Sequence, residues 1–111
     1  MADTVTAAEL LVVLADPTRR QVVELLAEHP RRAGELAEAV GTSRSAMSQH
    51  LRVLVETGVI DDERLPEDAR ARQFQLRGEA LAGIQAWLDQ LQAHWRIQLD
   101  AFKRQTERKS R

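Results

Sequence analysis

The sequence predicts a mainly helical α+β fold, with about five helices and one two-stranded β-hairpin in a single domain over residues 1–111. Apolar residues recur at helical spacing along most of the chain, and glycines and prolines divide this pattern into separate segments. Only about residues 59–76 alternate with the period of two that strands show. A chain of 111 residues has room for one hydrophobic core, which agrees with a single domain.

The first two helices are predicted from an apolar stripe and a strong helix start. Residues 6–14 place their leucines on one side of a helix. Asp16 then precedes Pro17, which is an N-cap residue followed by proline at the first helical position. The second helix ends before Pro30, because the residue that precedes a proline is disfavoured in the α region.

Two further helices are predicted over about residues 33–57, joined by a short turn that contains glycine. The first runs over about 33–40 and ends at Gly41, since glycine readily takes the left-handed conformation that ends helices. Ser43 is the expected N-cap of the second, and Gly58 ends it. Two helices joined in this way form a helix-turn-helix motif.

A hairpin is predicted directly after this motif. Strands at residues 59–64 and 70–76 flank a tip that holds Pro66. A hairpin in this position is a wing, so the fold is predicted to be a winged helix-turn-helix with its wing at about 59–76.

The last predicted helix, at about 79–106, has apolar residues at the a and d spacing of a coiled coil. A core this small cannot cover a helix so long and so apolar on one side, so a partner is expected. Its stripe consists of Leu81, Ile84, Leu88, Leu91, Trp95 and Phe102.

The helix that begins after Ser43 has an apolar face and a polar face. The inward face holds Met47, His50, Leu51 and Leu54, and the outward face holds Ser45, Ser48, Gln49 and Arg52, with Arg44 at the N-terminal edge. Small residues let a helix enter the major groove of DNA, and Gln and Arg supply bidentate hydrogen bonds to base edges. An ordinary solvated helix is the alternative, but the preceding turn and the following wing favour DNA binding.

The charges are segregated along the chain, although the net charge is −1. Residues 61–68 are acidic, residues 69–77 carry arginines and no acid, and residues 103–111 are basic. The low net charge argues against indiscriminate binding of polyanions, while local positive charge remains compatible with DNA binding.

Three segments resemble one known family: Leu14–Arg20, Gly34–Ala37 and Ser45–Leu54. In these segments the chain resembles the ArsR/SmtB family of winged helix-turn-helix repressors, and the similarity runs over about residues 10–76. The resemblance implies a homodimer, joined by its first and last helices, that binds a double-stranded DNA operator and represses transcription.

The resemblance also implies which residues contact DNA and which contact the partner subunit. It makes Arg44, Ser45, Ser48 and Gln49 the groove-reading positions and Arg52 a phosphate contact. The arginines of the wing, Arg64, Arg70 and Arg72, would reach phosphates, although the acidic wing opposes this. The implied dimer interface contains Leu10, Leu11, Leu88, Leu91, Trp95 and Phe102.

The chain departs from the members of this family that sense metals. It has no cysteine, and residues 35–40 lie where such members hold a cysteine pair. The last helix has only His94, and one imidazole beside Asp89 or Asp100 suits zinc poorly, because zinc takes three or four ligands in fixed geometry. We therefore expect no metal and no cofactor, and the effector is unknown.

Other function classes find little support. No Ser, His and acid group recognisably, and no glycine-rich phosphate loop exists, so no enzyme is expected. Neither a signal segment nor a long apolar run is present, and arginine far outnumbers lysine, which together favour a bacterial, cytoplasmic protein without a membrane partner. Two alternatives stay open: a protein-interaction module with an acidic wing, and a metal or small-molecule sensor that uses His94 and the dimer interface. Repression and activation are both compatible with the motifs.

Overall fold

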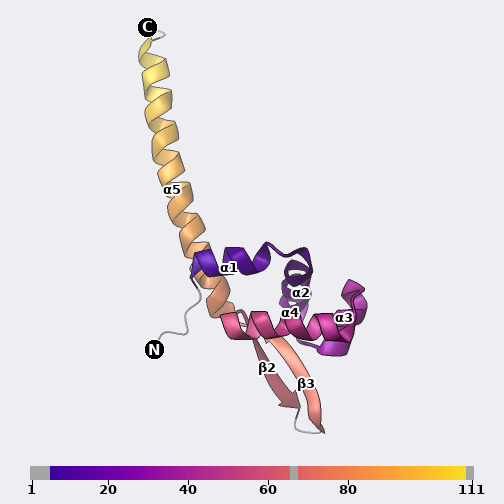
Figure 1. Cartoon of the computed structure of the whole chain (residues 1–111). Coiled ribbons are helices and arrows are strands. Elements are labelled where there is room, and N and C mark those ends of the chain that lie inside the picture. The colour runs from indigo at the N-terminus through magenta and orange to yellow at the C-terminus, as the bar shows by residue number, and fades with distance from the viewer. Residues whose placement is uncertain (1–5, 66–67, 110–111) are drawn as a thin grey trace.

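The computed structural model describes residues 6–65 and 68–109, with the side chains of residues 64–71 left out of the description. It contains five helices and a small sheet, as the sequence predicts, in the arrangement of a winged helix-turn-helix (Figure 1). The elements in chain order are α1 (Ala7–Leu14), α2 (Pro17–Glu28), β1 (Arg31–Arg32), α3 (Ala33–Val40), α4 (Arg44–Thr57), β2 (Ile60–Leu65), β3 (Asp68–Leu76) and α5 (Gly78–Lys109).

Asp16 caps the N-terminus of α2, as predicted. Its carboxylate accepts hydrogen bonds from the backbone N–H groups of Thr18 (2.8 Å) and Arg19 (3.1 Å), and Pro17 stands at the first helical position. These bonds, above all the one from Arg19, favour the charged carboxylate and lower the pKa of Asp16 below its ordinary value of 3.8. The start of α2 is therefore set by local chemistry that the sequence displays.

The sheet has three antiparallel strands in the order β1-β3-β2, whereas the sequence predicts only the two strands of the hairpin. The additional strand, β1, pairs Arg31 with Phe74 and Arg32 with Gln73. Two residues are too few to show a period of two, so this strand left no pattern in the sequence. Its pairing joins the base of the wing to the start of α3.

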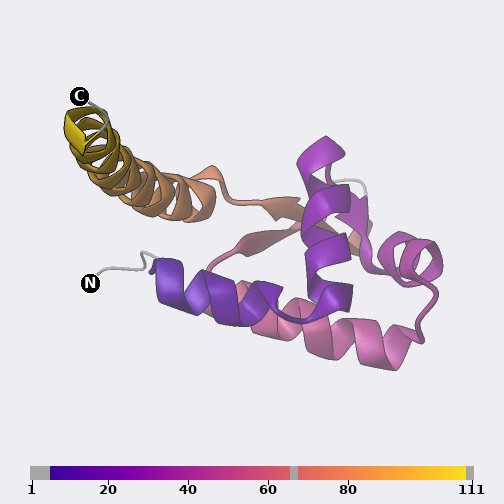
Figure 2. The ribbon, with the colours of Figure 1, turned by 90° about the horizontal axis from the view of Figure 1, so that it is seen from above.

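The hydrophobic core lies where α1 to α4 meet the base of the wing (Figure 2). Side chains from all five helices and the sheet are almost fully removed from solvent, which is the main source of stability for a domain of this size. The largest of those that are fully buried are Leu10, Leu36, Met47, Leu54 and Ile60.

Helix α5 leaves the body of the domain after its first two turns. Ala80 is buried against the core and Leu81 and Ile84 are half-buried, but the rest of the helix projects away alone (Figure 1). The radius of gyration is consequently 19.7 Å, whereas a compact domain of this length would have about 13 Å. Within the described ranges, no helix is both long and apolar enough to cross a membrane.

Candidate nucleic-acid interface

The turn between α3 and α4 is held by backbone hydrogen bonds and by one side-chain cap. Gly41 ends α3 in the left-handed conformation (φ 81°), and its N–H donates to the Ala37 carbonyl at 2.9 Å. The Ser43 hydroxyl then accepts from the Ala46 N–H at 3.1 Å and caps α4. Both residues were predicted in these roles. The direction in which α4 leaves α3 is thus fixed locally.

The inner face of α4 anchors the helix in the core. Met47 and Leu54 are completely buried and Leu51 is nearly so, as predicted, while His50 is half-buried. Each of these apolar side chains contributes roughly 1.5–3 kcal/mol on burial. The helix therefore has one orientation on the domain, and its other face is held outward.

The outer face of α4 is polar and, from Arg44 to Arg52, uncharged or basic. All five predicted DNA-contact residues of this helix are exposed. Among the described residues, none makes a side-chain hydrogen bond or an ion pair with the polar atoms of Gln49 or Arg52, so these atoms are available to a ligand. The residues of this face are Arg44, Ser45, Ser48, Gln49 and Arg52.

Arg44 lies over the start of α3. Its guanidinium Nη2 is 3.4 Å from the position that a Cβ on Gly34 would occupy. The absence of a side chain at Gly34 therefore leaves room for this guanidinium beside the helix-turn-helix. The contact was not foreseen from the sequence, because it joins two helices and follows no spacing rule within either.

Two acidic residues of the wing, Asp61 and Asp62, form ion pairs with arginines on β3 or directly after it. Asp62 forms an ion pair of 2.7 Å with Arg72, and Asp61 lies 3.7 Å from Arg77. The sequence analysis treated these carboxylates as a source of repulsion toward phosphates, but pairing reduces their free charge. Of the three wing arginines predicted to reach DNA, Arg72 is exposed, whereas the side chains of Arg64 and Arg70 lie outside the described part of the chain.

Two arginines of α2 stabilise the fold. Arg19 Nε donates to the Val13 carbonyl at 3.0 Å, and Arg20 Nη1 donates to the Leu14 carbonyl at 3.0 Å. They satisfy carbonyls at the C-terminus of α1, where a positive charge is also favoured by the helix dipole. The sequence analysis made no such assignment to either residue.

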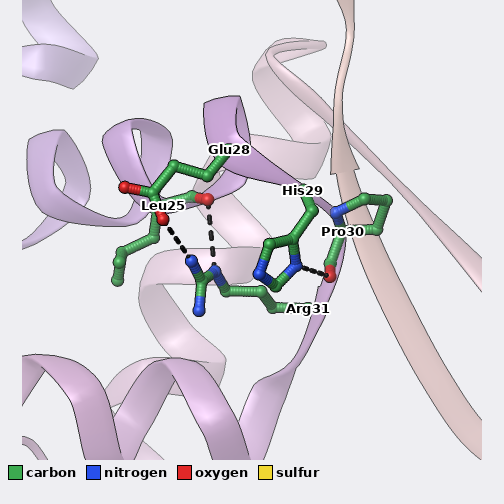
Figure 3. A network of polar contacts seen from close by, with 5 residues as sticks. All are labelled: Leu25, Glu28, His29, Pro30 and Arg31. Atoms are coloured by element: carbon green, nitrogen blue, oxygen red, sulfur yellow. Dashed lines mark hydrogen bonds and ion pairs between the residues drawn. The ribbon is translucent and has the colours of Figure 1, made fainter.

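Arg31 is tied to the last turn of α2 (Figure 3). Its Nε donates to the Leu25 carbonyl at 3.2 Å and its Nη2 pairs with Glu28 at 2.6 Å, with only 16% of the side chain exposed. Beside it, the His29 ring nitrogen Nδ1 lies 2.8 Å from the Pro30 carbonyl oxygen. Arg31 is thus engaged within the subunit and not directed at a ligand.

Helices α1 and α5 together carry a second surface, which is apolar. The five predicted interface residues other than Leu10 are all exposed in the single chain, with Trp95 63% exposed. Val12 on α1 is 71% exposed and was not predicted. The exposed large apolar residues are Leu11, Val12, Trp87, Leu88, Leu91, Trp95, Ile97 and Phe102.

The prediction that Leu10 lies at the subunit interface is wrong. Leu10 is 0% exposed, because the inward face of α1 consists of Leu10 and Val13, which pack into the subunit's own core. Leu11 and Val12 stand on the outward side. An apolar stripe read from the sequence could not distinguish the side that meets the core from the side that would meet a partner.

The described residues form no cluster of metal donors within one subunit. Metal-sensing chemistry needs several His, Cys or carboxylate donors in one place. Among residues 6–65 and 68–109, no three such side chains come close enough together to hold an ion. Asp89, which the sequence analysis considered as a partner for His94, instead accepts a hydrogen bond of 2.9 Å from Gln85.

Comparisons with known proteins agree on one family. Residues 16–62 match the family model described as bacterial regulatory protein, arsR family. The chain is 45% identical over 76 residues to the HTH-type transcriptional regulator Rv2034 of Mycobacterium tuberculosis (strain ATCC 25618 / H37Rv), which covers 68% of each chain. It is 39% identical over 51 residues to the transcriptional repressor SdpR of Bacillus subtilis (strain 168), covering 46% of this chain and 57% of SdpR.

The fold is also similar to solved structures. The ArsR-like transcriptional regulator from Rhodococcus sp. RHA1 superposes with a TM-score of 0.74 at 26% identity, covering 88% of this chain and 90% of that one. The arrangement of helices and wing is therefore shared over nearly the whole length of both proteins.

Proposed function

Because this chain belongs to the arsR family of bacterial regulatory proteins, we propose that it is a metal-independent repressor that binds a pseudo-palindromic operator as a homodimer. Membership in this family makes it a DNA-binding transcriptional regulator with a winged helix-turn-helix, and not an enzyme. We add to this that the protein represses transcription, that it needs no metal, that its operator is symmetric and that it binds as a dimer. The proposal includes a cytoplasmic location, and residues 1–111 as one DNA-binding domain.

The observation that carries the proposal is the free polar face of α4. Serine side chains are small enough to let the helix enter a major groove, while the amide of Gln49 suits adenine and the guanidinium of Arg44 suits guanine. In the proposal, Arg44, Ser45, Ser48 and Gln49 read bases. Arg52 and the wing arginines Arg64, Arg70 and Arg72 contact phosphates, which position the protein without specifying sequence.

The dimer is supported by the apolar surface of α1 and α5. Many large apolar side chains are exposed on these two helices, as at interaction sites, and a coiled-coil spacing suits a second copy of the same helix. A homodimer would cover Leu11, Leu88, Leu91, Trp95 and Phe102, and would place two α4 helices on one duplex. The symmetry of the operator follows from the symmetry of the dimer.

Metal independence is supported by the number of cysteine and histidine residues that the whole chain offers as metal ligands. With no cysteine and three histidines, it lacks the thiolates that such sensors use. The role as a repressor is supported by the name of the similar protein SdpR, a transcriptional repressor.

The decisive experiment selects duplexes from a random pool with the purified protein and maps the protected bases. We expect two half-sites about 10 bp apart, unchanged by zinc or by a chelator. If a dimer neutralises about eight phosphates, the logarithm of affinity falls against the logarithm of salt with a slope of about −7. Failure to enrich any sequence at moderate salt would contradict the proposal, and a single unrepeated half-site would contradict the dimer.

A further inference from the structure

A groove of about 480 Å³ lies between α4 and the wing. Small-molecule sites occupy about 300–1,000 Å³, so this groove is large enough for a small organic ligand. One wall is a side of α4 whose residues follow the three- and four-residue spacing of a helix. These residues are Ser48, Leu51, Arg52 and Val55.

The opposite wall belongs to the sheet. Arg72 and Phe74 are two positions apart on β3, so their side chains lie on the same face of the strand. Asp62 of β2 is the cross-strand partner of Phe74 in the antiparallel register, so its side chain lies on that face too. All three line the groove, which therefore depends on the pairing of β2 with β3.

The groove combines an apolar floor with two cations. Leu51 and Phe74 form much of the floor and are only 3% and 6% exposed. Arg52 is exposed, and within residues 6–65 and 68–109 its guanidinium is in no ion pair. Arg72 pairs with Asp62 through one Nη2–Oδ2 contact of 2.7 Å, which leaves most of its five N–H donors open, and 56% of its side chain is exposed. The two guanidiniums thus remain able to bind an anion beside the apolar floor.

This combination favours a ligand that is both apolar and negatively charged. An inorganic anion has no surface to cover the floor, and a neutral apolar molecule leaves the guanidiniums without a partner. A carboxylate on an apolar body satisfies both, because it buries apolar surface and accepts charge-assisted hydrogen bonds from arginine.

The carboxylates of the groove limit the charge of the ligand. Glu56 lines it one helical turn after Arg52, and Asp62 lies beside Arg72. Each repels a further negative charge, so a ligand with one carboxylate suits the groove better than one with two. The repulsion from Glu56 also directs that carboxylate toward the Ser48 end.

We propose that this groove binds a small organic monoanion, a carboxylate on an apolar body, and that its binding releases the protein from DNA. This inference rests on the proposed function and adds the regulation of the same surface. Arg52 and Arg72 are assigned to phosphates there, so ligand and DNA compete for both guanidiniums. The site lies within one subunit and apart from the apolar surface of α1 and α5, so release requires no change in the dimer.

The test uses benzoate as the probe and follows the backbone amide signals of the whole, DNA-free protein by NMR. We expect saturable shifts at Arg52, Val55, Arg72 and Phe74. Benzamide has the ring without the charge, and acetate has the charge without the ring, so each should bind at least about tenfold more weakly. Binding of either as tight as that of benzoate would overturn the proposed ligand class.

Two variants locate the site. Arg72→Ala should weaken benzoate binding by at least about tenfold. Arg104→Ala is the matched control, since it removes the same charge from the exposed distal part of α5, and it should leave binding unchanged. Unaltered binding in Arg72→Ala, or shifts confined to α1 and α5, would overturn the site.

Release from DNA is measured with the duplex selected from the random pool. Benzoate at about ten times its dissociation constant should raise the apparent dissociation constant for DNA at least about tenfold. Acetate at the same concentration should show only the ordinary effect of added salt. Equal effects of the two anions would overturn the competition. If no duplex can be selected, the proposed function itself fails, and that failure is distinct because benzoate binding is measured without DNA.

Discussion

The guanidinium of Arg44 rests beside Gly34, with Nη2 3.4 Å from the place of an added Cβ. Gly34 is the glycine of α3, and Arg44 is the first residue of α4, so the contact links the two helices of the motif at the edge of the proposed DNA-contact surface. A glycine inside a helix costs stability relative to alanine. Here the missing side chain leaves space for Arg44, a proposed DNA-contact residue.

Substitution at Gly34 should separate stability from DNA binding. Gly34→Ala should raise the free energy of unfolding by up to about 1 kcal/mol and change operator affinity little, because a separation of 3.4 Å from a flexible guanidinium is tolerable. Gly34→Leu should displace Arg44 and weaken operator binding several-fold. Thermal unfolding and fluorescence anisotropy measure the two quantities. Ala39→Leu, exposed on the same helix, is the control, and an equal loss of affinity there would contradict the role of Gly34.

Gln49 should determine sequence preference. Gln49→Ala should reduce the preference for the operator over random DNA by about 1–3 kcal/mol, because a bidentate amide contact to a base is lost. Arg52→Ala is the matched comparison: it should weaken binding to both kinds of DNA alike and make the salt slope shallower by about one per subunit. Competition assays with both duplexes measure the preference. Equal losses on both after the Gln49 change would reject base reading by that residue.

Trp95 should hold the dimer together. It is 63% exposed in the single chain, so Trp95→Glu leaves the subunit core intact but places a charge in the proposed interface. Burial of such side chains contributes roughly 1.5–3 kcal/mol apiece, so the dimer should dissociate at least about a hundredfold more readily, as measured by sedimentation.

Ile97 provides the control for this change. It is 64% exposed on the same helix but lies about 200° around the axis from Trp95, away from the apolar stripe. Ile97→Glu should leave the dimer unchanged. Dissociation by both substitutions would place the interface elsewhere.

Arg31 should contribute to stability and not to DNA affinity. Arg31→Ala removes the hydrogen bond to the Leu25 carbonyl and the pair with Glu28, at a cost of about 1–2 kcal/mol in chemical unfolding. Arg32→Ala, at an exposed neighbouring position, should cost less than about 0.5 kcal/mol. A larger loss of unfolding free energy in Arg32→Ala than in Arg31→Ala would contradict the role of Arg31 in stability.

The cap at Asp16 should make stability depend on acid pH. Because the folded state lowers the pKa of Asp16 below 3.8, its contribution is complete above that value and is lost as the pH falls through the lower folded pKa. Asp16→Asn keeps an oxygen that accepts from the same N–H groups but does not titrate. The difference in unfolding free energy between the two proteins should therefore shrink as the pH is lowered below about 4. A difference that stays constant across this range would contradict the prediction.

Local chemistry explains why most of the fold could be predicted from the sequence. Asp16, Gly41, Ser43 and Gly58 act within one or two turns of themselves, and each begins or ends a helix where expected. The polar face of α4 was predictable for the same reason, since it depends only on helical periodicity.

Features that depend on contacts between distant segments were not predictable. Strand β1 exists only because β3 lies beside it, and Leu10 is buried only because α1 turns that side toward the core. The pair of Asp62 with Arg72 joins residues ten positions apart across a hairpin whose register the sequence did not specify. From the sequence, the acidic residues were expected to counteract the binding of phosphates by the arginines. In the fold, some of these acids form ion pairs with arginines.

If the proposed homodimer assembles through the distal half of α5, this helix would link gene control to protein abundance. In a homodimer assembled through this helix, a monomer can bind only one half-site and therefore binds weakly, whereas the dimer binds both half-sites. While monomers predominate, the concentration of dimer grows with the square of the total protein concentration. A doubling of expression therefore raises the dimer concentration about fourfold. In the proposed dimer, a helix without a companion in its own domain would thereby sharpen the threshold at which repression begins.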